Sequence, residues 1–91
     1  MFVHKLVLSS HPVLSENDQL TSLAYMKNHP GFKGVIPPAE GTAYTLWETE
    51  ENANAFNPYN GLVVSLIVST EIMPLDQSGK VEADFFRFGP K

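Results

Sequence analysis

The chain opens with a run in which hydrophobic side chains lie on both sides of an extended backbone. Over residues 2–9, Phe2 and Leu6 fall on one side of a period of two, and Val3 and Val7 fall on the other. Because both faces are largely apolar, the pattern predicts a β-strand in the interior of a sheet that is covered on both sides.

A helical spacing of apolar residues follows the first predicted strand. Ser15, with Asp18 three residues later, is typical of the residues that cap the start of a helix. The residues after it fit one helical face, which we expect to pack on the core: Leu20, Leu23, Ala24 and Lys27. Proline and glycine in residues 28–31 predict the end of this helix.

Two short strand-like runs and a second helix come next. Residues 32–36 and 43–48 are separated by residues 37–42, which are rich in turn formers, so they predict a hairpin. On its second strand one face carries Ala43, Thr45 and Trp47, and the other carries Tyr44, Leu46 and Glu48. Thr49 is a good N-cap and Glu50 follows it in the first turn, which predicts a helix from there.

The last third of the chain gives a mixed signal. Residues 62–73 are rich in β-branched side chains that favour a strand, yet Leu62, Leu66 and Ser69 also fit a helical face. The local pattern therefore does not decide whether residues 62–73 form a helix or a strand. Residues 81–88 alternate cleanly and predict a final strand.

Composition limits what these elements can form. The chain has 91 residues, of which 43% are hydrophobic and 18% charged, so we expect a single globular domain over residues 1–91. Cysteine is absent and the net charge is −4, which rules out disulfides and disfavours nucleic acid as a partner. Residues 62–68 fall short of the roughly 20 apolar residues that span a membrane, and no signal peptide is evident, so we expect a cytoplasmic protein.

The predicted order of strand, helix, strand, strand, helix, strand is the ferredoxin-like βαββαβ arrangement of the α+β class. It places helices on one face of a four-stranded antiparallel sheet and leaves the other face bare. Because a chain this short gains stability from a partner when it has no disulfide or structural metal, we expect a homodimer in which two bare faces meet.

The chain resembles the dimeric α+β barrel superfamily, and within it the antibiotic biosynthesis monooxygenase-like (ABM) domains. The resemblance lies in residues 2–9, residues 29–32 and residues 46–51 with the helix that follows. It implies a dimeric barrel and, in some members, cofactor-free oxidation of a small aromatic or polyketide-like molecule. The haem-degrading branch is disfavoured, because its haem-ligating histidine has no match between Glu50 and Met73.

Six residues are candidates for such chemistry. The resemblance implies that Trp47 lines a ligand cavity, whereas packing alone would make it a core anchor. His4 can act as a base and Arg87 can hold a carboxylate or enolate, so these two are the catalytic candidates. A hydrogen-bonded structural histidine is the more common outcome for a residue such as His4, and an arginine such as Arg87 is more often a rim residue. The other candidate ligand-binding residues, which could also be rim residues, are Tyr25, His29 and Tyr44.

Two functions therefore stay open. The first is a homodimeric, ABM-like, cofactor-independent monooxygenase, and the second is a non-catalytic ligand-binding or assembly module of the same fold. We expect no cofactor, because nucleotide and flavin fingerprints are missing from the sequence. We also expect no metal site, because Glu50 and Glu51 are explained by the start of a helix.

Overall fold

The computed structural model describes residues 1–10, 15–56 and 66–86 of the chain. In these residues the elements are β1 (Phe2–Leu8), α1 (Glu16–Lys27), β2 (Phe32–Ala39), β3 (Thr42–Trp47), α2 (Glu50–Ala55) and β4 (Ile67–Pro74). Two short 3-10 turns follow β4, at Leu75–Gln77 and Glu82–Asp84. The chain is thus a small α+β domain built on a four-stranded antiparallel sheet.

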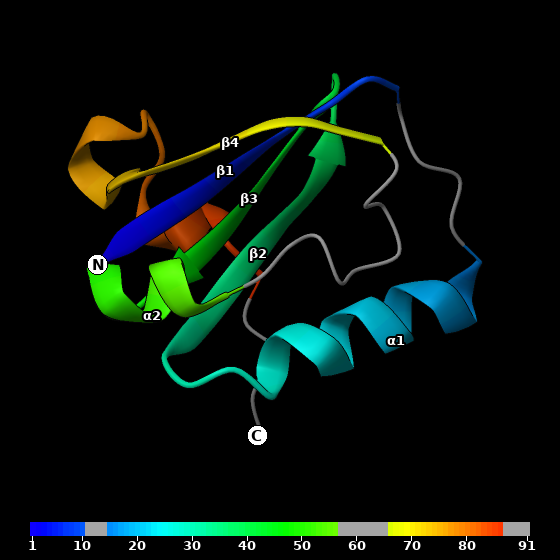
Figure 1. The fold of residues 1–91 in the computed structure, drawn as a ribbon, viewed down its shortest axis with the longest axis horizontal. Coiled ribbons are helices and arrows are strands. Elements are labelled where there is room, and N and C mark those ends of the chain that lie inside the picture. The colour runs from blue at the N-terminus through cyan, green and yellow to red at the C-terminus, as the bar shows by residue number, and fades with distance from the viewer. Residues whose placement is uncertain (11–14, 57–65, 87–91) are drawn as a thin grey trace.

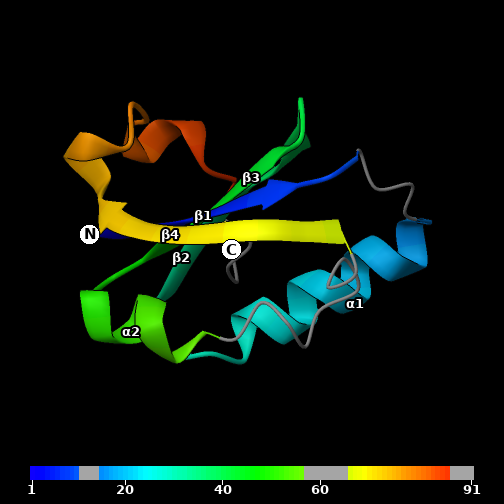
Figure 2. The same ribbon diagram turned by 45° about the horizontal axis from the view of Figure 1, so that its top comes forward.

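The strands are arranged in the order β2-β3-β1-β4, and each neighbouring pair is antiparallel (Figure 1). β1 lies in the interior of the sheet, as its two apolar faces predict. Val3 is opposite Leu46 on one side and Met73 on the other, so these three side chains share a face. Both helices lie on one side of the sheet, and the 3-10 turns lie on the other (Figure 2).

The first helix begins where the sequence predicts but packs differently. The Ser15 side chain accepts a hydrogen bond from the backbone N–H of Asp18, and the helix ends at Lys27. Leu20, which we expected to face the core, is 58% exposed. The expected face is wrong, because α1 reaches the core through its last turn, where Tyr25 and Met26 pack against the buried residues beneath α2.

The hairpin of β2 and β3 is tighter than predicted. β2 continues as far as Ala39, which is opposite Thr42, so only Glu40 and Gly41 form the turn. Both have positive φ, 53° and 79°, as a two-residue hairpin turn requires. The register shifts between Ile36 and Ala39, a segment of two prolines that have no N–H to donate to a neighbouring strand.

The second helix confirms its predicted start. The Thr49 hydroxyl accepts a hydrogen bond from the backbone N–H of Asn52 at 3.1 Å, and Glu50 and Glu51 lie in the first turn. The helix has only six residues, yet it places Ala53 and, directly after its end, Phe56 against the sheet.

The structure settles the ambiguous region and corrects the last predicted strand. Ile67–Pro74 is a strand paired with β1, whereas residues 62–65 lie outside the described part. Residues 82–84 form a 3-10 turn instead of a strand, because the Asp84 carboxylate accepts the Val81 N–H at 2.9 Å and closes the chain on itself. Strand-like pairing is limited to Phe86, which forms an isolated bridge to Val35, and residues 87 and 88 are not described.

The buried residues divide between the two faces of the sheet. The face beneath the helices holds Trp47, Ala53 and Phe56. The opposite face holds a purely apolar group, Val3, Leu46 and Phe85. Phe85 belongs to the segment that follows β4. We call residues 81–86 the strap. The expectation of a bare second face is therefore wrong, since the strap covers part of it.

Candidate functional site

Six rings gather beneath the helices, and we call them the ring cluster: His4, Tyr25, His29, Phe32, Trp47 and Phe56. Phe56 is at its centre. The centroid of the Phe56 ring lies 4.9 Å from that of Trp47, 5.3 Å from that of His29 and 5.7 Å from that of His4. The rings come from β1, α1, β2, β3 and the residues that directly follow α1 and α2, so the cluster forms only when the whole helix-covered face is assembled.

Trp47 is the best-anchored member of the ring cluster. Its side chain is completely buried, and its indole N–H donates a hydrogen bond of 2.8 Å to the Thr45 hydroxyl. The same hydroxyl donates to the backbone carbonyl of His4 at 3.3 Å. Because the indole donor already has an internal partner, Trp47 contributes a flat apolar wall to the site and no free hydrogen-bond donor.

His4 is a buried imidazole with one unsatisfied nitrogen. It is 4% exposed, its ring meets that of Phe56 edge-on, and its Nδ1 has no hydrogen-bond partner. Desolvation by burial lowers the pKa of His4, and a backbone hydrogen bond with Ala53 acts in the opposite direction. A carbonyl can only accept, so Nε2 carries the hydrogen and Nδ1 keeps its lone pair in a neutral ring. Nδ1 can therefore accept a hydrogen bond or a proton, and it lies among apolar rings.

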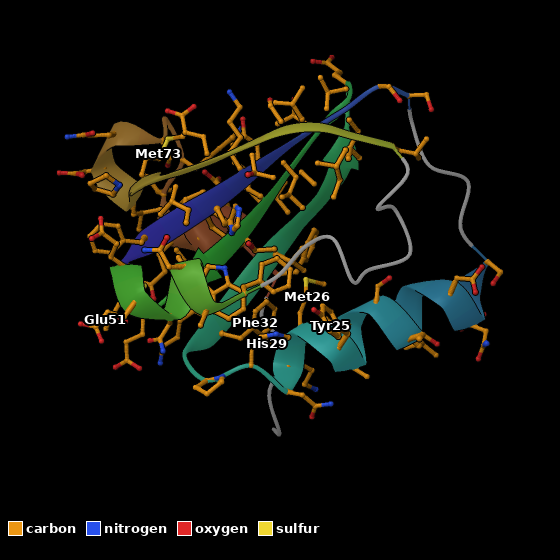
Figure 3. The ribbon with its side chains drawn as sticks, in the orientation of Figure 1. Tyr25, Met26, His29, Phe32, Glu51 and Met73 are labelled. Atoms are coloured by element: carbon orange, nitrogen blue, oxygen red, sulfur yellow. The ribbon has the colours of Figure 1, made fainter. Side chains whose placement is uncertain are left out.

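His29 and Tyr25 form the partly exposed side of the ring cluster. Figure 3 shows both at the end of α1, close to Met26 and to Phe32 of β2. The Nδ1 of His29 lies 2.9 Å from the backbone carbonyl of Tyr25, one helical turn earlier, so Nδ1 is the donor of this hydrogen bond. The Tyr25 and His29 rings meet edge-on at 4.7 Å. A molecule that reaches the cluster from solvent would meet these rings first.

Of the remaining two candidates, Tyr44 does not join this group. Tyr44 lies on the opposite face of the sheet, packed against the apolar group around Val3, with the Lys80 ammonium 5.2 Å from the centre of its ring. Its distance from Trp47 follows from the alternation of a strand, since residues 44 and 47 point to opposite faces. Arg87 lies outside the described residues.

The acidic side chain directly before α2 is explained by an ion pair at the surface. Glu48 approaches the Lys33 ammonium at 4.0 Å, with both side chains well exposed. Over residues 1–10, 15–56 and 66–86, no three histidine, cysteine or acidic side chains come together as a metal site would require. In the same residues, no helix is both long and apolar enough to cross a membrane.

An open depression of about 510 Å³ lies at the base of the strap, away from the ring cluster. Its lining includes Leu75 and Val81 with the charged side chains Asp76, Lys80 and Glu82. None of the five candidates that the structure describes lines it, so these residues and the depression are in different places.

Sequence reasoning missed three contributors to the site. Phe56 is the centre of the ring cluster, Phe32 packs its ring 5.5 Å from that of Trp47, and Thr45 satisfies the indole. The period of two on β3 was sufficient to place Thr45 beside Trp47. Phe56 has no such signal, because its position depends on how α2 folds back over the sheet.

No protein-family model matches the chain, and no curated protein or solved structure matches it either.

Proposed function

We propose that this chain is a non-catalytic ligand-binding module of the ferredoxin-like, ABM-like kind, which holds a small aromatic molecule against the ring cluster. The observation that carries the proposal is the centre of that cluster, where Phe56 is in contact with the rings of Trp47, His29, Tyr25 and His4. Flat apolar walls with a few fixed polar atoms are what a small-molecule site needs.

The arrangement of polar atoms selects the ligand. In a neutral ring, His29 Nε2 is an acceptor because Nδ1 donates to the Tyr25 carbonyl, and His4 Nδ1 is a second nitrogen with no partner. The indole N–H of Trp47 is already used inside the protein. A ligand for this site should therefore be a hydrogen-bond donor, such as a phenol or a dihydroxyaromatic compound.

Trp47 is the only tryptophan, so its fluorescence reports on the ring cluster without interference. Titration with dihydroxynaphthalene should shift or quench this emission in a saturable way. We expect His29→Gln to weaken binding about tenfold, as loss of one well-placed hydrogen bond does. Tyr44→Phe removes a hydroxyl from the other face and is the matched control, which should bind as the wild type does.

A second candidate function is favoured by His4 alone. A neutral imidazole with a free lone pair in an apolar site can remove a proton from a substrate hydroxyl, which leaves a phenolate with charge delocalised onto a ring carbon. The ring can then reduce oxygen without a cofactor, so that one oxygen atom enters the ring to give a hydroxyquinone and the other leaves as water. This is the chemistry that the resemblance to ABM oxygenases implies. Oxygen uptake with a dihydroxyaromatic substrate should then fall at least about tenfold in Trp47→Phe and further in His4→Phe. No uptake over a panel of such substrates would remove the enzymatic version and leave the binding module.

We also propose that two copies pair through the sheet face opposite the helices. Beyond the strap this face carries Lys5 and Glu71, which are opposite one another on neighbouring strands, together with the half-buried Val7. Lys5 and Glu71 side by side form a self-complementary pattern, since a two-fold axis can set each lysine against the other copy's glutamate. Light scattering at high micromolar concentration should give twice the chain mass of 10.1 kDa.

A further inference from the structure

The rings around Phe56 are too close together to admit another ring between them. Aromatic rings in contact have centroids about 4.5–7 Å apart. The centroid of the Phe56 ring is 4.9 Å from that of Trp47, 5.3 Å from that of His29 and 5.7 Å from that of His4. Because the Trp47 side chain is completely buried, a molecule can stack on the indole only by taking the place of a ring that covers it.

The space of the Phe56 ring has the shape of a slot for a flat molecule. This ring lies at 31° to the indole of Trp47, and the rings of His4 and His29 meet it at 89° and 85°. Without it, the indole would be a nearly parallel wall and the two imidazoles would be walls at right angles. Offset stacking and edge-on contact are the arrangements that aromatic rings prefer.

Phe56 is also the ring that can leave this slot without breaking a polar bond. The side chains of Trp47, His29 and His4 each form a hydrogen bond with the protein. Phe56 has a hydrocarbon side chain and follows a helix of only six residues, with an extended backbone at φ −70° and ψ 124°. Rotation of this side chain into another staggered rotamer leaves the pairing of the strands intact.

The Nδ1 of His4 marks what the slot lacks while Phe56 fills it. His4 is 4% exposed, and its Nδ1 has no hydrogen-bond partner in the described part of the chain. The neighbouring Phe56 ring presents only C–H groups to the imidazole. A buried acceptor without a partner is rare in folded proteins, because it has lost its hydrogen bonds to water. A hydroxyl on a ring in the position of Phe56 would supply the missing donor.

We propose that Phe56 is a built-in occupant of the ligand site, and that a hydroxyaromatic molecule binds by replacing its ring on Trp47 and donating its hydroxyl to His4 Nδ1. This inference rests on the proposed binding of a small aromatic molecule at the ring cluster. Phe56 is then an intramolecular inhibitor. The measured dissociation constant of the ligand is raised in proportion to how rarely the Phe56 ring is out of the slot in the free protein.

The first test is the dissociation constant of dihydroxynaphthalene, measured by isothermal titration calorimetry on variants that circular dichroism shows to be folded. Phe56→Ala removes the occupant, so it should bind at least about tenfold more tightly than the wild type. Phe32→Ala is the matched control, because it makes the same change in a ring 5.5 Å from Trp47 that is carried by β2. It should stay within about threefold of the wild type.

The second test separates the proposed slot from an ordinary cavity. An apolar cavity would prefer naphthalene to dihydroxynaphthalene, since a hydroxyl without a partner is costly to bury. We expect Phe56→Ala to prefer dihydroxynaphthalene at least about tenfold, and the double variant with His4→Phe to lose this preference. A preference of Phe56→Ala for naphthalene would overturn the inference.

The third test uses the wild type, so it does not depend on whether Phe56→Ala folds. Nuclear Overhauser contacts between the Phe56 ring and the Trp47 indole should disappear when dihydroxynaphthalene binds, and contacts from the probe to Trp47 and His4 should replace them. If the probe binds and the contacts from Phe56 to Trp47 persist, displacement is overturned while the proposed binding stands. Binding by Phe56→Ala but not by the wild type would support both. No binding by either protein would overturn both.

Discussion

The two faces of the sheet are closed in different ways. Beneath the helices, residues from five parts of the chain form the ring cluster, which encloses polar atoms: the indole N–H, the Thr45 hydroxyl and the unpaired Nδ1 of His4. On the other face Phe85 seals a wholly apolar group that contains no such atom. The difference supports the proposed ligand site on the helix side, where the buried polar atoms lie.

The largest effect on the free energy of unfolding should come from truncating the central buried phenylalanine of each face in turn. Phe56 and Phe85 are 5% and 4% exposed, so burial alone predicts equal costs for replacing them by alanine. We expect Phe56→Ala to lower the free energy of unfolding by about 3–5 kcal/mol, the usual cost of a large core truncation. Phe85→Ala should cost at least about 1 kcal/mol less, because the strap can detach locally while the sheet persists. Urea denaturation measures both, and equal losses would show that the strap is as integral as the helix side.

A smaller loss of stability should follow from breaking the hydrogen bond between the Trp47 indole and the Thr45 hydroxyl. Thr45→Val preserves shape but leaves the Trp47 indole N–H buried without a partner, which should cost about 1–3 kcal/mol. Thr42→Val is the control, since it lies on the same strand and its hydroxyl takes no part in the network. If the two variants unfold at the same urea concentration, the hydrogen bond to Trp47 contributes nothing to stability.

The smallest expected effect depends on pH. Burial lowers the pKa of His4 in the folded protein, so the unfolded chain takes up a proton first as the pH falls through its ordinary value of about 6.5. The contribution of neutral His4 is fully present above that pH and is lost below it, with a slope of at most about 1.4 kcal/mol per pH unit. His4→Phe cannot titrate there, so the stability of the wild type relative to this variant should decrease from pH 7.5 to pH 5. A constant difference would mean that His4 is not buried as described.

Local patterns predicted most of the elements correctly. The interior position of β1, the caps at Ser15 and Thr49, and the hairpin all follow from residues within a few positions of one another. The faces of β3 were also predicted, and they already implied that Tyr44 and Trp47 could not share a site. His4 is two positions from both Phe2 and Leu6, so the period of two places it on their side of β1, where it lies with the ring cluster.

Most of the errors concern contacts between distant segments, and the strap is the local exception. Strand β4 was ambiguous because its conformation is decided by pairing with β1, whose partner residues lie 59 (Leu8 to Ile67) to 72 (Phe2 to Pro74) positions away in the chain. The strap has a strand-like sequence, yet the side chain of Asp84 turns it back before it can pair. The unpaired nitrogen of His4 and the central position of Phe56 depend on how α2 lies over the sheet, and no periodicity contains that information.

The central claim is that the strap belongs to the same chain whose sheet it covers. A sample that mixes isotope-labelled and unlabelled copies allows nuclear Overhauser contacts within a chain to be separated from those between chains. We predict contacts from the Phe85 ring to the methyl groups of Val3 and Leu46 within one chain. Contacts found only between different copies, or none from Phe85 to these residues, would contradict the account.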